Sequence, residues 1–130
     1  RLSGPLLDRV DVQVDVLPVT RVRREPAAGG EASAVVAARV RAARDRARRR
    51  LAGTTWTTNA EVPGAWLRRQ VGVPVEALDR ALDRGALSLR GVDRVLRVAW
   101  TLADLAGRDA PGREEVGQAL LLRTRGQVGA

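Results

Sequence analysis

The chain has 130 residues, of which 45% are hydrophobic, and it carries a formal net charge of +8. This length suits one domain with a real core and is too short for two. The sequence contains no His, Cys or Lys, which excludes Cys/His zinc sites, disulfides, a His general base and the lysine with which a P-loop binds nucleotide phosphates.

The first predicted element is a β-strand over residues 11–17, because valines alternate with polar residues at positions 10, 12, 14 and 16. Pro18 ends this strand, and residues 20–32 have the composition of a linker. No other segment has a clear strand pattern. We therefore expect the partner sheet to lie in an upstream part of a longer protein, of which this chain is the C-terminal piece.

Helical patterns cover the rest of the chain. We expect helices over residues 33–52, 63–70, 74–84, 89–106 and 111–123, followed by a loose tail over 125–130. Aromatic residues make up only 2% of the chain, so the core must be built from Leu, Val and Ala. The predicted fold class is all-α, a bundle of about five helices with an N-terminal strand extension. The predicted boundary separates residues 1–32, the end of another domain, from a helical domain over 33–130.

The helix predicted over 33–52, with Ser33 as its N-cap, combines a narrow Val/Ala stripe with many arginines. Arg41, Arg44 and Arg48 are its candidate contacts to nucleic acid, because guanidinium groups suit phosphates. The alternative is that these arginines only form a solvated face of a helix that packs through its apolar stripe. The absence of Lys and the abundance of Arg, Ala and Gly are also typical of a GC-rich genome, so the charge alone does not decide between the two.

Two further arginine sites stand out. Arg9 lies just before the predicted strand, where it could reach a phosphoryl group in a neighbouring subunit, or else pair with Asp8 or Asp11 as an ordinary surface residue. Arg90, Arg94 and Arg97 share one side of the helix predicted over 89–106, which Ser88 caps.

A helix start that carries an arginine favours a bound phosphate through both its free N–H groups and its guanidinium group. The alternative is pairing within the helix, between Asp93 and Arg97 and between Arg97 and Asp104.

Four motifs carry a resemblance to a known family. The run SGPLLDRVD over 3–11 resembles the stretch that closes the ATPase core of magnesium-chelatase-type AAA+ proteins, and SLRGVDRVLRVAWTLADLAG over 88–107 resembles the sensor-2 helix of their lid. NAEVPG over 59–64 and the closing EEVGQALLLR over 114–123 match as well. The similarity covers essentially the whole chain and is least specific over 18–50.

The resemblance implies a lid domain from a ring-forming, hexameric ATPase that uses ATP and Mg²⁺ bound mainly by its upstream core. Arg9 would be the arginine finger that acts in the next subunit, and Arg90, followed by Arg97 and Arg94, would be the sensor-2 candidate for the γ-phosphate. The isolated chain is expected neither to hydrolyse ATP nor to bind it tightly.

The family has two branches, and the alternatives stay open. LLDRVD and LRVAWTLADL are nearer to the chelatase-like branch of competence-type DNA motors for branch migration, although Trp100 stands where that branch often has Arg. The other branch is subunit I of magnesium chelatase, which drives metal insertion into protoporphyrin. A stand-alone basic DNA-binding domain is the third interpretation. The expected partners are the protein's own core, neighbouring copies and DNA. No apolar run approaches the roughly 20 residues that span a bilayer. The expected compartment is the cytoplasm.

Overall fold

The structure is a computed structural model that describes residues 3–16, 18, 30–70 and 72–128. Within these residues the fold is all-helical, with six α-helices and one short 3-10 helix. They are, in chain order, α1 (Gly4–Leu7), α2 (Ser33–Arg50), η3 (Asn59–Glu61), α3 (Gly64–Arg68), α4 (Glu76–Asp83), α5 (Leu89–Ala106) and α6 (Arg113–Val128). The predicted all-α class is thus confirmed.

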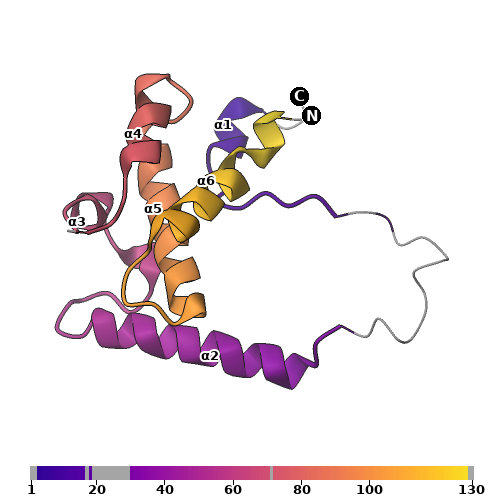
Figure 1. Cartoon of the computed structure of the whole chain (residues 1–130), viewed down its shortest axis with the longest axis vertical. Helices are drawn as coiled ribbons and strands as arrows, with labels where there is room; N and C mark the ends of the chain where they lie inside the picture. Colours follow the sequence, from indigo (N-terminus) through magenta and orange to yellow (C-terminus); the bar gives the residue numbers. More distant parts are fainter. Residues whose placement is uncertain (1–2, 17, 19–29, 71, 129–130) are drawn as a thin grey trace.

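Helix α5 is the centre of the bundle. It packs against α2, α3, η3, α4 and α6, and Figure 1 shows it enclosed between α2 on one side and α4 and α6 on the other. Val95, Leu96, Ala99 and Ala103 on α5 are almost completely buried. The helix begins at the predicted cap, where the Ser88 hydroxyl accepts a hydrogen bond from the Gly91 N–H at 3.1 Å. It ends at Gly107, whose φ of 74° is the left-handed conformation expected after a helix.

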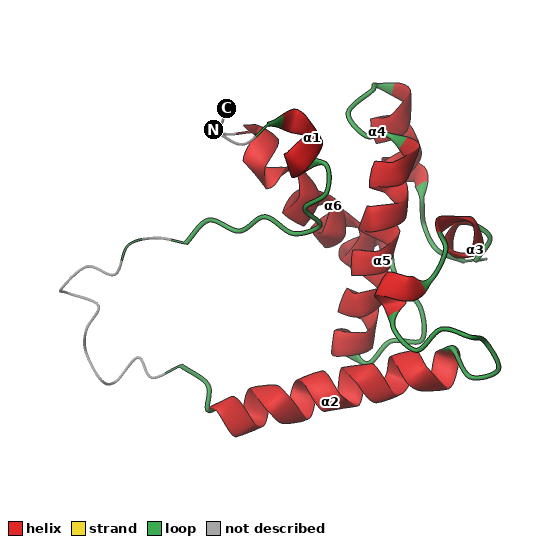
Figure 2. Ribbon diagram, turned by 180° about the vertical axis from the view of Figure 1, so that it is seen from behind, coloured by secondary structure: helices red, strands yellow, loops and turns green. Residues whose placement is uncertain are grey.

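Helix α2 lies across one end of the bundle and extends beyond it (Figures 1 and 2). Ala43, Ala47 and the following Leu51 are buried against the core, whereas all residues from 31 to 39 are exposed. Only the second half of the predicted apolar stripe therefore packs. The predicted N-cap is wrong by one position, because Ala32 is the cap and Ser33 is the first helical residue.

The predicted strand over 11–17 is not formed in the described residues 11–16; Leu17 lies outside them. This segment instead runs along α6, and the Gln13 N–H donates to the Leu122 carbonyl at 2.8 Å. Val12, Val14 and Val16 are all exposed. The physical reason is that a strand needs a neighbouring strand for its backbone groups, and no described residue supplies one.

The C-terminal helix is longer than predicted. Helix α6 continues to Val128, whereas the pattern had indicated an end near position 123 and a loose tail. Of the predicted linker over 20–32, residues 20–29 lie outside the described residues, and 30–32 have no helix until α2 begins. Helix α1, which the sequence did not predict, lies beside the end of α6, as both ribbon views show.

Candidate functional site: the Arg9 loop and the start of helix α5

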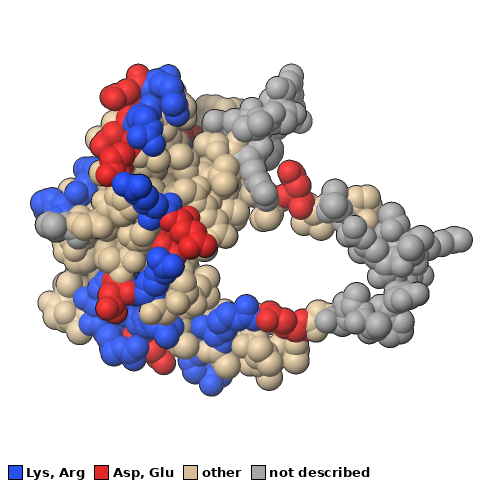
Figure 3. Space-filling model, viewed as in Figure 1, with Lys and Arg blue, Asp and Glu red and all other residues tan. Residues whose placement is uncertain are grey.

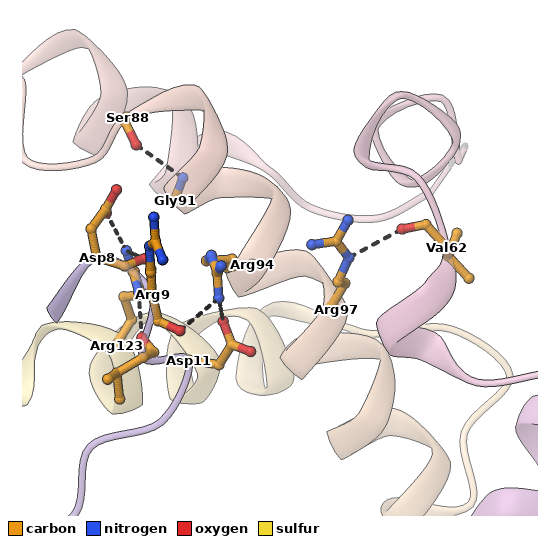
Figure 4. A network of polar contacts seen from close by, with 10 residues as sticks. Asp8, Arg9, Asp11, Val62, Ser88, Gly91, Arg94, Arg97 and Arg123 are labelled. Atoms are coloured by element: carbon orange, nitrogen blue, oxygen red, sulfur yellow. Dashed lines mark hydrogen bonds and ion pairs between the residues drawn. The ribbon is translucent and has the colours of Figure 1, made fainter. Parts of the chain in front are cut away.

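Arg9 lies in the turn that follows α1, where the Arg9 N–H donates to the Leu6 carbonyl and the Val10 N–H to the Leu7 carbonyl. Its side chain is exposed and forms no ion pair with any described residue. The alternative that Arg9 pairs with Asp8 or Asp11 is therefore not realised. Both of these carboxylates have other partners, which leaves the Arg9 guanidinium available as a donor (Figure 4).

Arg123 on α6 is the partner of Asp8. It is buried, with a residue exposure of 6%, and its Nη2 lies 2.6 Å from Asp8 Oδ1 and 3.0 Å from the Asp8 carbonyl oxygen. Its Nη1 donates to the Val10 carbonyl. Sequence reasoning missed this residue, because no local pattern indicates contacts between residues more than a hundred positions apart.

The three candidate arginines of α5 make three different sets of contacts. Arg94 Nη1 donates to the Arg9 carbonyl at 3.0 Å and lies 2.5 Å from Asp11 Oδ1. Arg97 Nε donates to the Val62 carbonyl at 3.1 Å. Arg90 is exposed near the start of the helix, and its side chain makes no hydrogen bond with the described residues. Figure 4 shows that Arg94 and Arg9 lie next to each other, with Arg97 pointing towards Val62.

The alternative of ion pairs within α5, between Asp93 and Arg97 and between Arg97 and Asp104, is not realised. Asp93 pairs with Arg68 of α3, and Asp104 pairs with Arg50 of α2. The acidic side chains of α5 therefore connect it to other helices, while Arg97 turns to a backbone carbonyl.

Asp104 is the centre of a buried polar network that joins α2, η3 and α5. Its residue exposure is 1%, and its two carboxylate oxygens accept from Arg50 at 2.5 and 2.9 Å and from Asn59 at 2.9 Å. The Arg50 guanidinium also lies over the Trp100 ring, 4.5 Å from its centroid. Trp100 is 4% exposed. The position at which this sequence departs from the family pattern therefore faces the core.

Contacts within the fold explain much of the NAEVPG motif, which lies in the segment from Thr57 to Gly64. The Glu61 carboxylate accepts from the Thr57 and Thr58 N–H groups at 2.7 and 3.0 Å, and also from the Thr57 hydroxyl. These bonds, that to the Thr57 N–H first, lower the pKa of Glu61 below its ordinary value. Asn59 joins the Asp104 network, and Gly64 lies so close to Asp93 that a Cβ atom would overlap its carboxylate.

The arginines of α2 divide into two groups. Arg46 and Arg50 turn inward, where Arg46 donates to the Asp104 carbonyl at 3.0 Å. The nucleic-acid candidates Arg41, Arg44 and Arg48 are exposed, and within the part of the chain that the structure describes only Arg48 pairs with an acid, Asp45 at 3.3 Å. Figure 3 shows basic side chains over α2 on the face in view. Arg44 and Arg48 also border a groove of about 620 Å³ between α2, η3 and the end of α5.

The fold and these motifs define a class of protein. Residues 30–123 match the family described as "Magnesium chelatase, subunit ChlI C-terminal", and the chain belongs to this family.

Several curated proteins are similar to it. An uncharacterized protein of Mycobacterium tuberculosis (strain H37Rv) is 51% identical over 129 residues, which cover 97% of this chain and 25% of that protein. The uncharacterized protein YifB is 34% identical in Salmonella typhimurium over 127 residues and in Escherichia coli K12 over 128 residues. Each of these two matches covers 95% of this chain and 24% of the relative. The chain thus spans about a quarter of the curated relatives that it matches.

No solved structure matches the chain. Among the described residues, no helix combines the length and the apolar character needed to cross a bilayer.

Proposed function

We propose that this chain is the helical lid of a magnesium-chelatase-like AAA+ ATPase and assists ATP hydrolysis in a ring of identical subunits. The observation that carries the proposal is the state of Arg9: it is exposed and unpaired among the described residues, while Arg123 and Arg94 occupy the two carboxylates beside it. An arginine that stabilises phosphoryl transfer in a neighbouring subunit needs such a free guanidinium group. The SGPLLDRVD motif supports the same role.

Arg90 is the preferred sensor-2 residue in this proposal. Arg94 and Arg97 already hold backbone carbonyls, whereas Arg90 is exposed beside the capped start of α5. A guanidinium group can bind phosphate oxygens through two parallel hydrogen bonds, so both Arg9 and Arg90 fit the triphosphate of ATP. The chain has no Lys, so Mg²⁺ and most contacts to ATP would come from the upstream core, where the chain's valine-rich segment 11–17 would also find its sheet.

The proposed task of the ring is DNA remodelling, of the branch-migration type, in the cytoplasm. The exposed arginines of α2, Arg41, Arg44 and Arg48, would lie near the DNA phosphates. A second candidate is a role as subunit I of magnesium chelatase, which membership of the family of ChlI C-terminal domains favours. Its partners would be the other chelatase subunits in place of DNA.

The deciding experiment measures ATP hydrolysis by the full-length protein with and without single-stranded or branched DNA. We expect DNA to stimulate turnover and Arg9→Ala to lower turnover by roughly 10³-fold, because an arginine finger contributes about that much. Arg84→Ala, which removes another exposed arginine at the end of α4, is the matched control and should leave turnover unchanged.

Two results would contradict the proposal. Full turnover in the Arg9→Ala variant would exclude the arginine-finger role. Turnover that depends on Arg9 but is indifferent to DNA would favour the chelatase or another protein-remodelling task.

A further inference from the structure

Two arginines from different helices converge on the four residues around Arg9 (Figure 4). Arg123 of α6 contacts the carboxylate and carbonyl of Asp8 and the carbonyl of Val10. Arg94 of α5 contacts the Arg9 carbonyl and the Asp11 carboxylate. Three consecutive backbone carbonyls and both flanking acids are therefore held by two guanidinium groups.

The two arginine side chains in these contacts are largely buried. The Arg123 side chain is 7% exposed and that of Arg94 is 16% exposed, whereas the two acids are about half exposed. The segment is fixed further along by Gln13, whose backbone N–H donates to Leu122 and whose side-chain amide donates to the Arg123 carbonyl at 3.3 Å. Charge-assisted hydrogen bonds of this kind are stronger than neutral ones and are directional.

We propose that Arg123 and Arg94 are positioning residues for Arg9. They neutralise Asp8 and Asp11, which are the nearest acids in the sequence and would otherwise bind the Arg9 guanidinium. They also fix the backbone on both sides of Arg9, so that its side chain is presented in one place. A preorganised donor avoids reorganisation at the moment of phosphoryl transfer, which is why its position matters to the rate.

This role rests on the proposed function of Arg9, and it adds a link between distant parts of the chain. Arg94 and Arg90 belong to the same helix, four residues apart, so a movement of α5 would move the Arg9 loop as well. The lid would then adjust the arginine finger directly, through Arg94, which is 85 positions from Arg9, and through Arg123, which is 115 positions from Asp8.

The contacts themselves can be tested in the 130-residue chain, which has no Cys and accepts a single labelled site. A nitroxide attached to Arg9→Cys should show restricted motion in its electron paramagnetic resonance spectrum. Arg123→Gln, Arg94→Gln and Asp8→Asn should each increase that motion. Arg68→Gln, which breaks the Arg68–Asp93 pair away from the loop, is the matched control and should not. A label that is equally mobile in all of these variants would overturn the inference.

The functional role requires turnover measurements in the full-length protein. Arg123→Gln and Asp8→Asn should lower kcat for ATP by about tenfold with little change in KM, because the donor is displaced while nucleotide binding is kept. In an Arg9→Ala background the same substitutions should have no further effect. If the substitutions instead disrupt the fold, they should lower kcat further in the Arg9→Ala background as well. They should then also reduce the melting temperature, which is to be measured for each variant.

The outcomes separate this inference from the proposed function. If Arg9→Ala lowers turnover but Arg123→Gln does not, or if their effects add, the positioning role is wrong and the arginine finger stands. If Arg9→Ala leaves turnover unchanged, the proposed function fails and the positioning role with it, whatever the spin label reports about the contacts.

Discussion

Asp104 shows how strongly a single residue can determine this fold. It is fully buried and negatively charged, and it is balanced by Arg50 through two hydrogen bonds and by Asn59 through a third. Burial of a carboxylate without such partners would be costly, and so would removal of the carboxylate from beneath a largely buried Arg50. The network therefore fixes the position of α2 on α5 more specifically than apolar packing alone would.

We predict that Asp104→Ala lowers the free energy of unfolding of the isolated chain by about 3 kcal/mol, because it leaves Arg50 buried without its partner. The matched control is Asp45→Ala, which removes a half-exposed acid 3.3 Å from Arg48. The control should cost less than about 0.5 kcal/mol. Urea unfolding followed by circular dichroism measures both, and equal effects would show that the Asp104 network is not stabilising.

Single residues also mark the limit of what the sequence predicts. The motifs single out Arg9 and Arg90, and both side chains are exposed and without an ion pair among the described residues, while their roles stay predictions. Arg123 and the Asp8–Arg123 pair were not, because helical periodicity relates residues three or four positions apart and carries no information on a partner 115 positions away. The same holds for Asp104, which the sequence suggested only as a partner of Arg97 in its own helix and which lies in the core.

At the scale of elements, the approach of α3 to α5 depends on Gly64. A Cβ atom at this position would come within 2.0 Å of the Asp93 carboxylate, which pairs with Arg68. Gly117 in α6 is the opposite case, since a Cβ atom there would meet nothing within 4 Å. A side chain is therefore excluded by a close contact at Gly64, whereas there is room for one at Gly117.

We predict that Gly64→Ala lowers the melting temperature, with a loss of about 1–3 kcal/mol from overpacking. Asp93→Ala in the same molecule should relieve most of that loss. Gly117→Ala should raise stability by about 0.5–1 kcal/mol, because alanine favours a helix interior. Differential scanning calorimetry of these three variants and the unmodified chain tests this, and a stabilising Gly64→Ala would contradict the close contact with Asp93.

The secondary-structure elements were predicted well where the apolar periodicity is strong. They were predicted poorly where the structure depends on pairing with a neighbouring strand. Helices α2, α4 and α5 begin and end within about two residues of their predicted bounds. The segment over 11–16 has the alternating pattern of a strand, yet it forms none, because a strand also requires a neighbour that the pattern cannot supply. Helix α1 has only four residues, too few for any periodicity to appear.

At the scale of the whole molecule, the net charge of +8 invites a direct test of DNA binding. If the chain is a lid, its isolated form should bind single-stranded DNA weakly at physiological salt. We predict that replacing Arg41, Arg44 and Arg48 together by Gln weakens this binding. The slope of the logarithm of the binding constant against the logarithm of the salt concentration should become shallower by up to about 3. The reason is that each lost phosphate contact reduces this slope by about 1.

The control replaces three other exposed arginines, Arg69, Arg80 and Arg84, and removes the same charge. Fluorescence anisotropy of a labelled oligonucleotide over a salt series measures both variants. Equal losses would mean that only the total charge matters and that α2 is not a contact surface. Tight, salt-sensitive binding by the unmodified chain would favour the stand-alone DNA-binding interpretation.

The packing around the tryptophans has a spectroscopic consequence. The chain contains no Tyr or Phe, so its near-ultraviolet absorption and its intrinsic fluorescence come from three indoles alone. Trp56 and Trp66 meet edge to face with their centres 6.0 Å apart, while Trp100 is buried beneath a guanidinium group between α2 and α5. Separation of α2 from α5 would expose Trp100 to water and shift its emission to longer wavelengths. The protein thus carries its own optical reporter of that interface, which can be followed without any added dye.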